Sequence, residues 1–121
     1  MTETANVAMF AATMLHSATN THFFHWNTDS FSKHMALGAY YDEIVPLVDD
    51  LVEAYMGCYE QIKTFPSVYH QPKEAVKYLE SLKKFVDEAR KDLPQESQIQ
   101  NIIDEIAQLI DSTLYKLRFL K

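Results

Sequence analysis

Apolar side chains recur three or four residues apart along most of the chain, which is the period of a helix with one face in a core. Four stretches carry this pattern, at about residues 4–26, 32–64, 72–91 and 95–120. The second stretch is the longest, and its apolar seam alternates spacings of four and three without a miss. The seam consists of Leu37, Tyr41, Ile44, Val48, Leu51, Tyr55, Cys58 and Ile62.

Polar or proline-containing segments separate these four helices. Residues 27–30 form a predicted turn, and residues 65–71 form a short predicted connection between the second and third helices. Pro46 lies inside the second helix and predicts a kink there, because proline removes one helical hydrogen bond. Short connections place consecutive helices antiparallel, so we predict an all-α, up-down four-helix bundle with residues 1–121 as one domain.

The composition narrows the class of protein. Only 2 glycines and 4 prolines are present, which favours long helices over a turn-rich β fold. The net charge is −6 and no block of Lys or Arg occurs, so neither nucleic acid nor an anionic membrane is an expected partner. Cys58 is the only cysteine, and no apolar run is long enough to span a bilayer. No signal-peptide pattern is seen either, and a cytoplasmic location is the expectation.

Histidines and carboxylates gather around the first turn and along the second helix. Imidazole and carboxylate groups together suit Fe(II), Mn(II) or Zn(II). The predicted metal ligands are His25, His34, Asp49 and Glu53, with His22 and Asp42 as additional candidates. Each residue type also has an ordinary interpretation: acidic pairs are common on solvated helices, and a lone histidine on an apolar stripe is commonly a hydrogen-bonded core residue.

The spacing of these candidates decides what kind of site they can form. At 1.5 Å per residue, His34 and Asp49 lie about 22 Å apart along one helix and cannot bind the same ion within one chain. The predicted third and fourth helices contain no histidine, so a Glu-x-x-His centre inside one bundle is also excluded. Two copies of the second helix packed antiparallel about a two-fold axis near Asp42 would bring His34 of one copy to Asp49 and Glu53 of the other. We therefore predict a homodimer through the second helix, and leave open a larger homo-oligomer.

This arrangement resembles the Dps family of mini-ferritins. The resemblance covers about residues 10–60 and rests on His25-Trp26-Asn27, Phe31, His34, Asp49 and Glu53, with the family's spacing of fifteen and then four residues. It implies a ferritin-like bundle in which the two histidines and the partner's two carboxylates bind iron for oxidation by peroxide or oxygen. The chain is also similar to short phage-encoded relatives of this fold.

The sequence departs from the Dps pattern at one position of the expected site. Gly38 stands where the family usually has an aspartate, and the chain lacks the Lys-rich terminal tail. The resemblance therefore leaves two hypotheses open: an iron-binding protein with or without ferroxidase activity, and a non-catalytic interaction protein on a ferritin-like scaffold. A three-histidine enzyme site from His16, His22 and His25 is disfavoured, because six residues place His16 and His22 on nearly opposite helix faces, about 240° apart.

Overall fold

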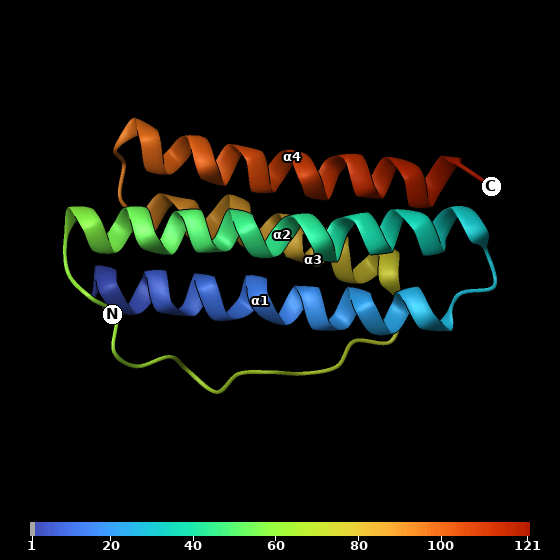
Figure 1. The fold of residues 1–121 in the computed structure, drawn as a ribbon, viewed down its shortest axis with the longest axis horizontal. Helices are drawn as coiled ribbons and strands as arrows, with labels where there is room; N and C mark the ends of the chain where they lie inside the picture. Colours follow the sequence, from blue (N-terminus) through green and yellow to red (C-terminus); the bar gives the residue numbers. More distant parts are fainter. Residues whose placement is uncertain (1) are drawn as a thin grey trace.

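The computed structural model describes residues 2–121, which contain four α-helices and no strand (Figure 1). The helices are α1 (Glu3–Asn27), α2 (Phe31–Cys58), α3 (Ala75–Ala89) and α4 (Ser97–Phe119), with a 3-10 turn η1 (Arg90–Asp92) after α3. The prediction of an all-helical bundle with four helices is therefore confirmed. None of these helices is long and apolar enough to cross a lipid bilayer.

Capping side chains set where two of the helices begin. The Ser30 hydroxyl accepts a hydrogen bond from the Lys33 amide and starts α2. The Glu74 carboxylate accepts from two amides in the first turn of α3, so this helix begins at Ala75 and not at the predicted Pro72. Pro46 lies within α2, which continues to Cys58 without a break.

The connection between α2 and α3 differs most from the sequence prediction. The second helix ends at Cys58, not near Thr64, and the predicted short connection is wrong because residues 59–74 contain no helix. In Figure 1 this segment, which we call the strap, runs along the bundle from the end of α2 to the start of α3. Ile62 of the strap is 7% exposed, so its apolar seam position is filled by a non-helical residue.

The four helices surround one core, and each contacts two neighbours. Both α1 and α4 pack against α2 and against α3. Contacts between α1 and α3 join Phe10 to Phe85 and Asn20 to Tyr78, so these two helices run in opposite directions. Because the strap returns along the bundle, α2 and α3 run in the same direction (Figure 1). The predicted up-down order, with every pair of consecutive helices antiparallel, is therefore wrong for this pair.

A buried hydroxyl pair links α1 to α2 inside this core. The Ser17 hydroxyl donates to the Met14 carbonyl, and the Tyr40 hydroxyl lies 2.8 Å from the same Ser17 oxygen. Because the Ser17 proton is already used, Tyr40 is the donor in that second bond. Both residues are fully buried, and burial raises the pKa of Tyr40 above its usual range.

This geometry predicts unequal costs for two conservative substitutions. Ser17→Ala should lower the free energy of unfolding by about 1–3 kcal/mol, because it leaves the Tyr40 hydroxyl buried without an acceptor. Tyr40→Phe should cost only about 0.5–1.5 kcal/mol, because Ser17 keeps its bond to Met14. Urea unfolding of both variants measures the difference, and a larger loss in Tyr40→Phe would contradict the assigned donor.

Candidate metal centre

His25 and His34 meet at the corner between α1 and α2. Their rings stack, with centroids 3.6 Å apart and planes inclined by 18°. Each ring also bonds to the other residue's backbone: His25 Nδ1 lies 2.6 Å from the His34 carbonyl oxygen, and His34 Nδ1 lies 2.8 Å from the His25 carbonyl oxygen. The short turn at residues 28–30 makes this reciprocal pairing possible, because it brings the end of α1 beside the first turn of α2.

These two bonds determine which ring nitrogen can bind a metal. A carbonyl oxygen only accepts hydrogen bonds, so each Nδ1 must carry a proton. In a neutral ring the lone pair then belongs to Nε2, and no hydrogen bond within residues 2–121 uses Nε2 of His25 or His34. A backbone carbonyl on Nδ1 is the usual support of a metal-binding histidine, so both rings are oriented as potential Nε2 ligands.

Gly38 allows His25 to lie this close to α2. A Cβ atom added at Gly38 would stand 3.1 Å from Cε1 and 3.2 Å from Nδ1 of His25, closer than ordinary van der Waals contact. The imidazole thus occupies the space beside α2 that a side chain at position 38 would need. A side chain at position 38 would therefore have to displace the His25 ring by a few tenths of an ångström.

Two glycine substitutions on α2 test this contact, because a Cβ added at Gly57 meets nothing within 4 Å. Gly57→Ala should raise the free energy of unfolding by about 0.5–1 kcal/mol through helix propensity alone. Gly38→Ala should gain less or lose stability, and should shift the ring resonances of His25 and His34 in 15N NMR spectra. Equal stabilisation by both substitutions, with unchanged ring resonances, would show that the close approach does not hold His25.

The predicted carboxylate ligands lie apart from this histidine pair. Asp42, Asp49 and Glu53 are exposed on α2, and α2 is one continuous helix between them and His34. Within residues 2–121 of a single chain, no three His, Cys, Asp or Glu side chains come together as a metal site. The structure therefore brings together His25 and His34 and leaves Asp49 and Glu53 about four and five helical turns away from His34.

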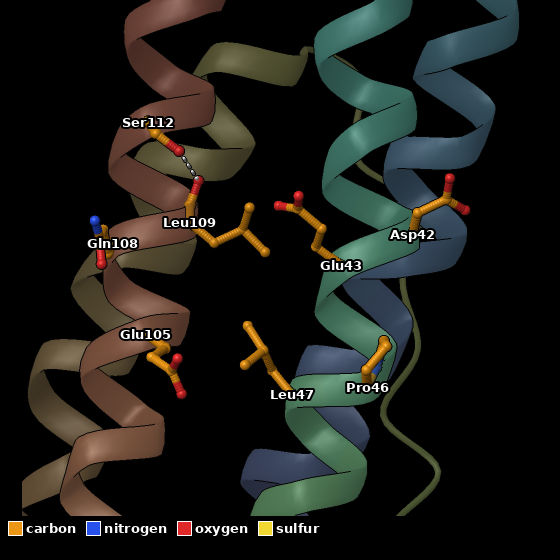
Figure 2. A pocket seen from close by; sticks show the side chains of 8 residues that line it. All are labelled: Asp42, Glu43, Pro46, Leu47, Glu105, Gln108, Leu109 and Ser112. Atoms are coloured by element: carbon orange, nitrogen blue, oxygen red, sulfur yellow. Dashed lines mark hydrogen bonds between the residues drawn. The ribbon is translucent and has the colours of Figure 1, made fainter.

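A groove between α2 and α4 adjoins this acidic part of the molecule (Figure 2). Its volume is about 460 Å³, and Leu47, Glu43 and Glu105 are among its lining residues. In Figure 2 Glu43 points across the groove toward α4, whereas Asp42 points away from α4. Asp42 also lines the groove, at its edge on α2.

The remaining candidate, His22, belongs to an aromatic cluster beside the histidine pair. Its ring stacks on Tyr41 with ring centroids 4.1 Å apart, and the ring centroids of His22 and Trp26 are 4.4 Å apart. The His22 and His25 rings meet edge to face at 6.0 Å. His22 is therefore a neighbour of the candidate ligands, and its ring packs between two aromatic side chains. Trp26 itself is 65% exposed, whereas His25 and His34 are partly buried.

Sequence reasoning did not identify Asn20 as a structural anchor. Asn20 is 2% exposed, and its amide joins α1 to the strap and to α3 through Tyr69, His70 and Tyr78. The available signal was a run of polar residues, Ser17, Asn20 and Thr21, on the buried stripe of α1. Buried polar side chains require partners, so such a run indicates tertiary hydrogen bonds.

A comparison with protein families matches residues 25–117 to a family of unknown function, DUF5856. The chain belongs to this family. The match begins at His25, includes every other candidate ligand except His22, and ends within α4. Searches of curated proteins and of solved structures found no match for this DUF5856 member.

Proposed function

We propose that this protein is a ferritin-like, Dps-type protein that binds iron or a similar divalent metal at a site shared by two copies of the chain. The observation that carries the proposal is the histidine pair, in which backbone carbonyls hold both Nδ1 atoms and no hydrogen bond from residues 2–121 uses either Nε2 atom. Such rings supply neutral nitrogen ligands to Fe(II), Mn(II) or Zn(II).

The path of the chain supports the ferritin-like part of the proposal. Ferritin-like bundles contain one long crossover between helices, whereas simple up-down bundles have only short loops. The strap is one such long connection, and it leaves α2 and α3 running in the same direction (Figure 1). The long crossover therefore agrees better with a mini-ferritin bundle than the short connection that the sequence predicted.

Charge and exposure on α2 support the shared site. Five carboxylates lie on α2, and none of them takes part in the salt bridges of residues 2–121, which all join residues of α3, η1 and α4. Packing two α2 helices antiparallel near Asp42 would set Asp49 and Glu53 of one copy near His34 of the other. A bound cation would then neutralise carboxylates that would otherwise repel each other. Met35 and Val45 are exposed on α2 and would lie near that interface.

The chain's own groups define what each part of the site would do. His25 and His34 would supply nitrogen ligands, Asp49 and Glu53 of the partner copy would supply oxygen ligands, and the adjacent Tyr41 ring would shield one side. Oxidation of bound Fe(II) by peroxide or oxygen is the further reaction that the Dps resemblance implies. A reducing cytoplasm, where Fe(II) persists and the single exposed cysteine stays reduced, is the proposed setting.

The proposal is tested by titrating the purified, metal-free protein with Fe(II) under argon and measuring its mass by sedimentation. We expect a dimer or a larger even-numbered assembly that binds about two irons per dimer, because a two-fold axis generates identical sites in pairs. Admission of peroxide then tests oxidation through the ferric absorbance. A monomer, or the absence of saturable binding at micromolar Fe(II), would refute the shared site.

A second candidate function, that of an interaction protein without catalysis, is favoured by a separate surface. Large apolar side chains are exposed at the end of the bundle where α2 begins and α4 ends, and Ser32 bonds to the Leu120 carbonyl there. The exposed residues are Phe31, Met35, Tyr115, Phe119 and Leu120. Clustered exposed apolar side chains are typical of protein contacts. The same titration separates the two candidates, because an interaction protein binds no iron at micromolar concentration.

A further inference from the structure

A cavity of about 300 Å³ lies between α1, α3 and the strap, and the candidate metal centre does not use it. Met9, Leu82 and Phe85 provide apolar walls from the two helices, and Val68 of the strap provides another. One water molecule takes up about 30 Å³ in the liquid, so the cavity has room for a molecule of about ten non-hydrogen atoms.

The internal hydrogen bonds of Asn20 fix the polar end of this cavity. Its Oδ1 accepts from the Tyr69 hydroxyl at 2.9 Å, and its Nδ2 donates to the Tyr78 hydroxyl at 3.1 Å and to the His70 carbonyl at 3.4 Å. Asn20 thereby ties the strap and α3 to α1. The cavity is consequently bounded on three sides by elements that one buried side chain holds in place.

Two hydroxyl protons at the cavity have no acceptor among residues 2–121. The Tyr78 oxygen accepts from Asn20, and no hydrogen bond within residues 2–121 uses the Tyr78 proton. Burial raises the pKa of Tyr78, so this proton is retained at neutral pH. Ser81 also lines the cavity and makes no side-chain hydrogen bond to the described residues. The polar end thus offers two hydroxyl donors to a ligand that accepts hydrogen bonds.

The charge of the lining further restricts the ligand. Although the chain has a net charge of −6, no Asp, Glu, Lys or Arg lines this cavity. A cationic ligand would find no carboxylate there, whereas an anionic oxygen would meet hydroxyl donors and the ring of His16. Hydrogen bonds to a charged acceptor are about twice as strong as those between neutral groups.

We propose that this cavity binds a small carboxylic acid with an apolar body, of the size of benzoate or octanoate. The carboxylate accepts hydrogen bonds from the Tyr78 and Ser81 hydroxyls. The apolar body packs against Leu82, Phe85 and Val68. This site lies on the α1–α3 side of the bundle and is independent of the metal site proposed on the α1–α2 side.

The test is a titration of the full chain with benzoate and octanoate, followed by methyl NMR of Met9 and Val68. We expect saturable shifts of both methyl signals, with benzylamine and toluene, which lack an accepting oxygen, binding at least about tenfold more weakly. Tyr78→Phe and Ser81→Ala should each weaken benzoate binding by about threefold to tenfold. Tyr115→Phe, which changes an exposed tyrosine on α4, is the matched control and should bind benzoate as the parent does.

Three results would overturn the proposal. The first is the absence of methyl shifts with about 10 mM benzoate or octanoate. The second is equal binding of toluene or benzylamine. The third is unchanged benzoate affinity in Ser81→Ala, a substitution that removes an exposed hydroxyl without an internal partner and therefore leaves the fold intact.

Discussion

Phe10→Ala is expected to lower the free energy of unfolding by about 3–5 kcal/mol, which approaches the whole stability of a small domain. Phe10 is 0% exposed on α1, and its ring stacks on Phe85 of α3 with centroids 5.8 Å apart. The α1–α3 pair is the least extensive of the four helix pairings in the bundle, so loss of this ring removes a large share of its contact. Urea or thermal unfolding followed by far-UV circular dichroism measures the change.

Phe31→Ala is the matched control for this experiment. Phe31 is 76% exposed at the first position of α2, so its removal should change the unfolding free energy by no more than about 0.5 kcal/mol. A loss in Phe31→Ala as large as that in Phe10→Ala would mean that the exposed ring is buried by another copy or another segment. A loss below about 1 kcal/mol in Phe10→Ala would contradict the assigned core.

Periodic spacing predicted the helices well because burial of one face leaves a regular trace in the sequence. The seam of α2 from Leu37 to Tyr55 is buried at nearly every predicted position, with Tyr41 as the half-buried exception. The same rule failed beyond Cys58, because Ile62 is buried without being helical. An apolar residue at the right interval shows that a position is inside, and cannot show whether the backbone that brings it there is a helix or an extended strap.

The candidate site was only partly predictable for a related reason. The short turn at residues 27–30 was enough to predict that His25 and His34 would be neighbours, because helices joined by a few residues must meet at that corner. The role of Gly38 depends on a contact between α1 and α2. From the sequence alone, this glycine could only be compared with the residue that the Dps pattern has at the same position. The cavity beneath the strap depends on Asn20, whose partners are about 50 residues away in sequence. Such long-range polar contacts leave no periodic signal.

Two defective variants are expected to recover iron binding when they form a mixed dimer. His34→Ala removes a nitrogen ligand from each site of its own dimer, and the double variant Asp49→Asn with Glu53→Gln removes both oxygen ligands. Each variant alone should bind essentially no Fe(II). In a mixed dimer one site combines the intact histidine of one copy with the intact carboxylates of the other, while the second site lacks both sets.

The expected recovery follows from two-fold symmetry. Random association of equal amounts gives about one half mixed dimers, each with one intact site of two, so the mixture should bind about one quarter of the iron bound by the parent. Co-expression with two different affinity tags allows mixed dimers to be isolated, and these should reach about one half of the parent capacity. Mixed dimers that bind no iron would contradict a site shared between copies. Full binding by either variant alone would show that the altered residues are not ligands. A site within one chain is not an alternative for these residues, because His34 and Asp49 lie about 22 Å apart along the helix.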